Sequence, residues 1–293
     1  MLVRVLGAAA GGGFPQWNCG CPQCEGVRAG TIRATPRTQE SIAVSANGEH
    51  WILVNASPDV RAQIESFPPL HPRPPRRTPI AAVVLTNADL DHCLGLLTMR
   101  EGTRLSVLAT ETVRRAFVED NVLCRALDRI EWVSLVPGAT REIAGLSIEA
   151  FSVPGKPPRY REGLTRPSDD DNVGLLLGEG GRLLGYASSV RAWSDGLSLA
   201  LSRAACVLVD GTFWSDDELI RLGCSTRRAR DMGHLPIGGE DGLLRSARGV
   251  ESARRIFIHV NNTNPILVET SPERAEVSAA GWEVAWDGME IAL

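Results

Sequence analysis

The sequence lacks several features that would assign the protein to a specialised class. No stretch of the 293 residues approaches the ~20 consecutive apolar residues of a membrane-spanning helix, so we expect no membrane insertion. Basic residues are not in excess, because 31 Lys and Arg stand against 35 Asp and Glu and give a net charge of -4. Nucleic-acid binding therefore has no electrostatic support. No internal repeat is visible, and the 43% hydrophobic content is typical of a soluble globular protein.

The chain also lacks the even number of cysteines expected of a disulfide framework, since it has seven. Three of them, Cys19, Cys21 and Cys24, lie within six residues, which is more typical of metal binding. The first residues, MLVRVLGAAAGGGF, resemble a signal peptide in their small and apolar side chains. However, the apolar part is short, is interrupted by Arg4 and follows no basic segment. We therefore expect a first strand here and a cytoplasmic protein.

Strand-like patterns are more frequent than helical ones along the chain. We expect strands or hairpins at 2–7, 41–57, 80–85, 146–153, 172–188, 205–214, 254–262 and 282–293, and helices at 60–67, 95–102, 111–127, 196–204 and 271–281. Residues 67–79 contain six prolines and predict a surface loop. This loop could be a domain linker, but the following strand needs partners from the earlier part. The order predicts two layered sheets with helices outside.

Three of the predicted core strands end in residues that commonly bind metals. The strand at 80–85 leads to Asp89, Asp91 and His92, while two later strands end at Asp210 and His259. A single Asp after a strand is usually a helix cap, and a single His is usually only hydrogen-bonded. Five such groups at three strand ends are harder to explain in that way. Carboxylates and neutral imidazoles are ligands for Fe, Mn and Zn, so the sequence predicts a metal site.

Longer motifs point to a known family. The segment TNADLDH (86–92) resembles the T-H-x-H-x-D-H pattern of the metallo-β-lactamase superfamily. WNCGCPQC, RTQESIAVS, NASPDVRAQI, SVPGKPP, DGTFWSDDELIRLG, MGHLPIGGEDG, IFIHVNNTNPIL and GWEVAWDGMEI resemble the family of coenzyme PQQ synthesis protein B. The resemblance covers essentially the whole chain. It implies an α/β (α+β) fold, an αββα sandwich of two mixed β-sheets flanked by helices, as one domain over residues 1–293. It also implies a role in making pyrroloquinoline quinone (PQQ).

The chain departs from the hydrolase pattern of this superfamily. Asn87 and Asp89 stand where hydrolases have the first two histidines, and the region near VPGKPPRY (153–160) has no third one. The resemblance implies that the other metal site is intact, with the ligands Asp91, His92, His259 and a bridging Asp210. We therefore expect one active-site metal. Asp89 is either an additional ligand or an acceptor beside the ligands, and both Asn87 and Asp89 are candidate catalytic residues.

Two histidines with carboxylates are typical of Fe(II) sites that keep open positions. The family resemblance implies an iron- and oxygen-dependent hydroxylase acting on the tyrosine ring of a Glu-Tyr unit from a precursor peptide. A carrier that moves PQQ or its precursor to the periplasm is the alternative, and a metal-dependent hydrolase is a third. His234 is a candidate acid, base or hydrogen-bond donor, because tRNA-processing relatives have a proton-donating His in this interval. A helix-capping or core role is the other explanation. The oligomeric state, a homodimer included, stays open.

The cysteine cluster predicts a second metal site, a zinc loop at residues 17–25. Cys19, Cys21 and Cys24 supply three thiolates, which suit Zn²⁺ at ~2.3 Å per bond. A fourth ligand is needed. Resemblance to a phosphodiesterase branch of the superfamily implies the position of Asn262, whose amide oxygen or a nearby backbone carbonyl could serve. Free buried thiols are the alternative. The glycine run at 7–13 is expected to be a loop that passes close to the active site, because no helix follows it.

Overall fold

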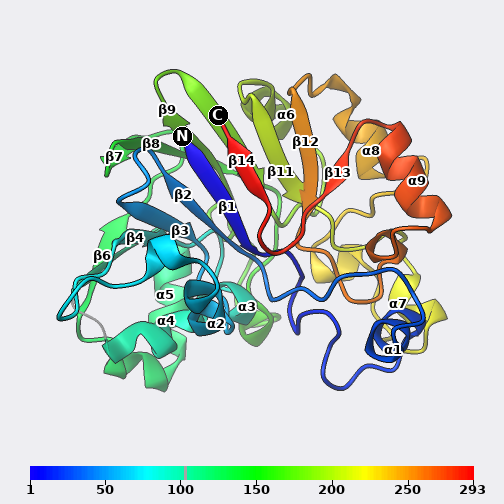
Figure 1. The fold of residues 1–293 in the computed structure, drawn as a ribbon, viewed down its shortest axis with the longest axis horizontal. Coiled ribbons are helices and arrows are strands. Elements are labelled where there is room, and N and C mark those ends of the chain that lie inside the picture. The colour runs from blue at the N-terminus through cyan, green and yellow to red at the C-terminus, as the bar shows by residue number, and fades with distance from the viewer. Residues whose placement is uncertain (102–103) are drawn as a thin grey trace.

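Two seven-stranded sheets pack face to face in the computed structural model, which describes residues 1–101 and 104–293 (Figure 1). The first sheet has the order β14-β1-β2-β3-β4-β5-β6. Its pairs are antiparallel from β14 to β3 and parallel from β3 to β6. The strand bounds are β1 Leu2–Gly7, β2 Ser41–Ser45, β3 Trp51–Val54, β4 Ile80–Val84, β5 Leu105–Ala109, β6 Ile130–Ser134 and β14 Glu290–Ala292.

The second sheet repeats this arrangement with the order β13-β12-β11-β10-β9-β8-β7. Its pairs are antiparallel from β7 to β10 and parallel from β10 to β13. The bounds are β7 Thr140–Ile143, β8 Leu146–Ser152, β9 Val173–Glu179, β10 Arg182–Ala187, β11 Cys206–Asp210, β12 Arg254–Ile258 and β13 Glu283–Val284. The parallel strands β4, β11 and β12 thus lie in the interior of their sheets, and their carboxyl ends lead to the predicted ligands.

Helices cover the outer faces of both sheets, with α2 to α5 on one side and α8 and α9 on the other (Figure 1). Their bounds are α1 Pro22–Ala29, α2 Val60–Glu65, α3 Leu90–Cys93, α4 Gly95–Thr98, α5 Glu111–Asp120, α6 Asp195–Ser202, α7 Glu218–Arg221, α8 Leu243–Ser246 and α9 Pro272–Ala279. No helix in the described part of the chain is both long enough and apolar enough to cross a bilayer. The predicted αββα sandwich of two mixed sheets is confirmed.

The core has three apolar layers that follow from the alternation of side chains along the strands. One layer lies between the sheets and includes Val5, Ile42, Ile148 and the fully buried Tyr186. Two further layers pack helices onto the outer faces. The buried parts of β4, β11 and β12 are apolar runs, at 80–84, 206–209 and 256–258, and the polar side chains of the site follow where these runs end.

The element predictions were mostly right, with local differences. The helix predicted at 111–127 ends at Asp120, because Asn121 donates its side-chain amide to the carbonyl of Phe117 at 2.8 Å and a 3-10 helix follows at Val122–Ala126. The helix predicted at 95–102 is split into α4 and a 3-10 turn at Met99–Glu101, and residue 102 lies outside the described residues. Strands β5, β6 and β7 and the short helices α1, α3, α7 and α8 were not predicted.

Candidate metal centre

The first ligand group forms where β4 and β12 end. The loop after β4 leads into α3, which carries Asp91 and His92, while His259 directly follows β12. Asp91 Oδ2 lies 3.2 Å from His259 Nε2 and 3.9 Å from His92 Nε2. One ligand atom from each residue lies within 4.8 Å of those of the other two. The structure therefore brings three residues together that are separated by up to 168 positions in the chain.

The second ligand group shares His259 with the first. Asp210, the last residue of β11, and His234 join it, again with ligand atoms all within 4.8 Å of one another. His234 Nδ1 lies 2.8 Å from Asp210 Oδ2. Asp210 is also an acceptor for the backbone N–H of Val190 and for the N–H and hydroxyl of Thr212, at 2.7, 3.0 and 2.6 Å. The carboxylate of Asp210 is thus already heavily hydrogen-bonded.

Thr212 fixes the tautomer of His259. Its hydroxyl donates to Asp210 Oδ1 and therefore accepts at 2.8 Å from Nδ1–H of His259. Nε2 of His259 is left to face Asp91 Oδ2 at 3.2 Å, and it becomes the metal-binding nitrogen once its proton is lost. The backbone supports the same orientation, because His259 has a φ of +60°, a left-handed conformation that is rare for residues other than glycine.

The glycine run at 7–13 passes beside this centre, as expected from the sequence. A Cβ atom added at Gly11 would lie 3.1 Å from Asp91 Oδ2. Ala10 and Gly11 also line the cavity above the ligand groups. Small residues are required here because a larger side chain would press on the carboxylate of Asp91.

The sequence reasoning missed one residue of the centre, Glu40. Its side chain is completely buried, and Oε2 lies 3.5 Å from His92 Nε2. Asn55 donates an N–H to Oε2 at 2.8 Å, and Asn55 itself has a φ of +60°. Glu40 directly precedes β2, so its position beside a fully buried strand was the only signal in the sequence.

Burial and the neighbouring charges shift the pKa values of these groups. Burial lowers the pKa of His92 to about 4, so this imidazole is neutral and able to bind a metal. Burial opposes protonation of His259, but Asp91 beside it raises the pKa to about 9. Burial would raise the pKa of Asp91, yet the imidazoles of His92 and His259 hold it below its usual range. Burial raises the pKa of Glu40 to about 8.

This donor set fits a divalent transition metal. It combines two imidazoles with carboxylate, the ligand types that suit Fe²⁺, Mn²⁺ and Zn²⁺. Nε2 of His92 and Oε1 of Glu40 are buried and have no hydrogen-bond partner among the described residues. Buried polar atoms of this kind are normally satisfied, so a ligand at this point would account for both.

A cavity of about 310 Å³ opens above the two ligand groups. Besides Asp91, His92, His234 and His259, its lining includes Asn87, Asp89, Tyr160 and three cations, Lys156, Arg159 and Arg227. Lys156, the single lysine of the sequence, lies 3.7 Å from Asp89 and 3.5 Å from Glu162. The cavity therefore combines a metal-binding floor with a positively charged rim.

Asn87 and Asp89, the residues at the positions of the missing histidines, line the cavity but belong to neither ligand group. Asn87 accepts the backbone N–H of Asp89 at 2.9 Å and donates to Asn172 at 3.4 Å. The carboxylate of Asp89 points instead toward Lys156, and the side chain is 30% exposed. In this position the carboxylate of Asp89 balances the charge of Lys156 at the rim of the cavity.

The three clustered cysteines also meet in space. The Sγ atoms of Cys19, Cys21 and Cys24 lie within 4.8 Å of one another, and all three thiols are free. Asn262 Nδ2 donates toward Cys24 Sγ at 3.3 Å and Cys21 Sγ at 3.7 Å. The amide nitrogen rather than the predicted amide oxygen thus faces the thiols, whereas the backbone carbonyl of Asn262 lies 3.7 Å from Cys21 Sγ. Cys224, isolated in the sequence, lies close enough to Cys19 that burial and this neighbour raise its pKa. The set fits a structural zinc.

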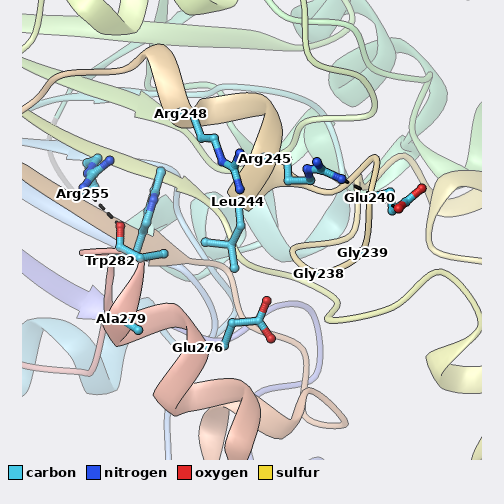
Figure 2. A pocket seen from close by; sticks show the side chains of 11 residues that line it. Gly238, Gly239, Glu240, Leu244, Arg245, Arg248, Arg255, Glu276, Ala279 and Trp282 are labelled. Carbon is cyan, nitrogen blue, oxygen red and sulfur yellow. Dashed lines mark hydrogen bonds and ion pairs between the residues drawn. The ribbon is translucent and has the colours of Figure 1, made fainter.

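A larger cavity, of about 650 Å³, lies elsewhere, against α8 and α9 (Figure 2). Arg245, Arg248 and Arg255 surround it together with Trp282 and Glu276. Arg255 covers one face of the Trp282 ring, and Phe257 stacks on that ring at 4.3 Å. The lining contains no His or Cys. We therefore assign the chemistry to the smaller cavity above the ligand groups.

Comparisons with known proteins agree with this fold. The family model "Beta-lactamase superfamily domain" matches residues 50–260. Coenzyme PQQ synthesis protein B of Ectopseudomonas mendocina is 46% identical over 305 residues, covering 100% of both chains. The crystal structure of Zn²⁺-bound PqqB from Methylobacterium extorquens has a TM-score of 0.95 at 44% identity, again over 100% of both chains. A diphosphatase of the PhnP family, at 19% identity and a TM-score of 0.69, shares the fold.

Proposed function

Because the chain belongs to the coenzyme PQQ synthesis protein B family of the metallo-β-lactamase superfamily, we propose that it hydroxylates an aromatic precursor of PQQ. The proposed substrate is a small peptide-derived molecule with a Glu-Tyr unit. In each hydroxylation one atom of O₂ is inserted into a ring C–H bond to give a hydroxyl group, and the other leaves as water. The two electrons that balance this reaction come from an external reductant, and two protons come from solvent.

The observation that carries the proposal is the composition of the first ligand group. Asp91, His92 and His259 form a two-histidine, one-carboxylate set beneath an open cavity. Asn87 and Asp89 occupy the positions where hydrolases of the superfamily have imidazole ligands for another metal. When bound, Fe²⁺ supplies the redox chemistry that oxygen activation requires, whereas Zn²⁺ has none. The proposal is thus for one redox metal rather than a zinc pair.

His234 is suited to handle the phenol proton of the substrate. Its Nδ1 is held by Asp210 at 2.8 Å, and its side chain is 13% exposed and lines the cavity. Nε2 is therefore the nitrogen available to a phenol hydroxyl. A carboxylate behind an imidazole fixes its tautomer and orientation, which is the arrangement a general base needs.

The rim supports a substrate with carboxylates. A Glu-Tyr unit carries the Glu side-chain carboxylate and a terminal carboxylate. The cavity that the tyrosine ring must enter is lined by Lys156, Arg159 and Arg227. Two carboxylates of the protein already face this rim, so the substrate carboxylates would replace Asp89 or Glu162 as partners of Lys156. The ring is thereby directed to the floor of the cavity.

The test begins with metal analysis of anaerobically purified protein, followed by oxygen uptake with a Glu-Tyr dipeptide. Iron-dependent uptake and a hydroxylated product are expected. His92→Ala should abolish both and leave the cysteine-bound zinc in place, so zinc content serves as the internal control for folding.

Two other outcomes would each refute the hydroxylase. Equal turnover with zinc in the strand-end site, under strict exclusion of iron, would favour a metal-dependent hydrolase, for which the second ligand group around Asp210 is the supporting observation. Tight binding of PQQ without turnover, unaffected by His92→Ala, would favour a carrier.

A further inference from the structure

Glu40 is a carboxylate that the proposed mechanism does not use. It is 0% exposed, and only Asn55 donates a hydrogen bond to it among the described residues. Its second oxygen, Oε1, has no partner among them. A buried carboxyl group with an unsatisfied oxygen must either stay protonated or have its charge compensated by a cation or further donors. The position of Glu40 therefore calls for a partner.

His92 does not provide that partner as a hydrogen-bond donor. Its Nε2 lies 3.5 Å from Glu40 Oε2, yet Nε2 also has no hydrogen-bond partner among residues 1–101 and 104–293. The other ring nitrogen, Nδ1, is approached by the Thr86 hydroxyl at 3.4 Å. Two buried polar atoms thus face each other beyond normal hydrogen-bonding geometry. This is the spacing of two atoms that bind the same ion, since ligands at ~2.1 Å from a metal lie roughly 3–4 Å apart.

We propose that Glu40 is a fourth protein ligand of the strand-end metal, together with Asp91, His92 and His259. The inference rests on the metal centre and is independent of whether the reaction is a hydroxylation. Glu40 lies outside the group whose ligand atoms are all within 4.8 Å of one another, so its carboxylate closes onto the ion when the metal binds.

Ligation by Glu40 has a consequence for access to the metal. Glu40 does not line the cavity, whereas Asp91, His92 and His259 do. Its carboxylate therefore approaches from the buried side and leaves the open positions facing the substrate. Two anionic ligands, Glu40 and Asp91, would also balance the charge of a divalent ion in the buried site, and oxygen ligands favour a hard metal such as Fe²⁺ or Mn²⁺.

Glu40→Gln tests the proposal, because it keeps the shape of the side chain and removes the charge. Co²⁺ is titrated anaerobically into protein whose cysteine loop holds zinc. We expect the variant to lose more than ~100-fold in Co²⁺ affinity, beyond the ~10–100-fold that is typical of residues behind the ligands. The visible absorption of bound Co²⁺ should change with the ligand set. Glu218→Gln is the matched control, because it alters a buried carboxyl group that belongs to neither ligand group and does not line the cavity, and it should bind Co²⁺ like the wild type.

The wild-type protein provides an independent readout, should the variant fail to fold. In a crystal structure with Co²⁺ bound, an oxygen of Glu40 should lie ~2.0–2.2 Å from the ion. Both oxygens beyond ~3 Å, or a loss of less than ~100-fold in the folded variant, would overturn the proposal while leaving the metal centre intact. Failure of the wild type to bind metal at the strand ends would instead overturn the centre itself.

Discussion

Replacing Lys156 by Gln should weaken the binding of a Glu-Tyr dipeptide to the zinc-loaded protein, which binds the substrate without oxidising it. The side chain of Lys156 is 16% exposed, so a substrate carboxylate beside it is only partly screened by water. A hydrogen bond to a charged group contributes ~1.5–3 kcal/mol. Asp89 and Glu162 compete for the same ammonium at 3.7 and 3.5 Å, which reduces the net gain. We take ~1–2 kcal/mol, which corresponds to a ~5–30-fold rise in Kd.

The assay is calorimetric titration of wild type and variant with the dipeptide and with its analogue in which both carboxylates are amidated. The variant should lose affinity for the dipeptide but keep its affinity for the amidated analogue. Arg159→Gln should have a smaller effect, ~2–5-fold, because this side chain is exposed and exposed ion pairs contribute only ~0.2–1 kcal/mol. Arg182→Gln, on β10 and remote from the cavity lining, is the control. An equal loss for both ligands would show that Lys156 acts through the structure of the cavity and not through the carboxylates.

Three further predictions concern the metals and a buried acid. Cys21→Ser should release about one zinc per chain and lower stability by several kcal/mol, since structural zinc contributes folding energy; unchanged zinc content and Tm would exclude a metal site there. Burial raises the pKa of Glu218 from 4.5 to about 7, so the protonated form is favoured in the folded state. The contribution of Glu218 to stability should be fully present below about pH 4.5 and be lost, by up to ~3 kcal/mol, as the pH rises through 7. In denaturant unfolding, the stability of Glu218→Gln should not show this loss with pH. Parallel pH profiles of stability for the variant and the wild type would contradict the assignment to Glu218. Asn87→His with Asp89→His should raise zinc occupancy and lower hydroxylation, and unchanged metal content would show that these positions do not determine the metal.

The sequence predicted the strands that position the site better than the strands at the sheet edges. β4, β11 and the second half of β12 are buried and therefore consist of apolar runs with abrupt polar ends. By contrast, β7 is exposed at three of its four positions, and β6 has no fully buried residue. Such strands are held by pairing with their neighbours rather than by a hydrophobic pattern, so their sequences do not reveal them.

The same reasoning explains which site residues were found. Asp91, Asp210 and His259 follow apolar runs, and the polar end of a buried run is visible in a sequence. Glu40 precedes its strand, and its significance depends on His92, which lies 52 positions later. No periodicity links two such positions, because their contact arises only when β2 and the loop after β4 are brought together in the fold.

The two ligand groups differ in how much of their bonding capacity is already used, and this difference favours a single metal. Oδ1 of Asp210 accepts two hydrogen bonds from Thr212, and Oδ2 accepts from Val190 and contacts His234. A bridging Asp210 would have to give up some of these bonds, and His234 would lose the carboxylate that orients it. Nε2 of His92 has no bond to lose, because it is unpaired among the described residues. An ion therefore gains most by binding at His92, and Asp210 does more for the chemistry by holding His234 than by binding a second ion.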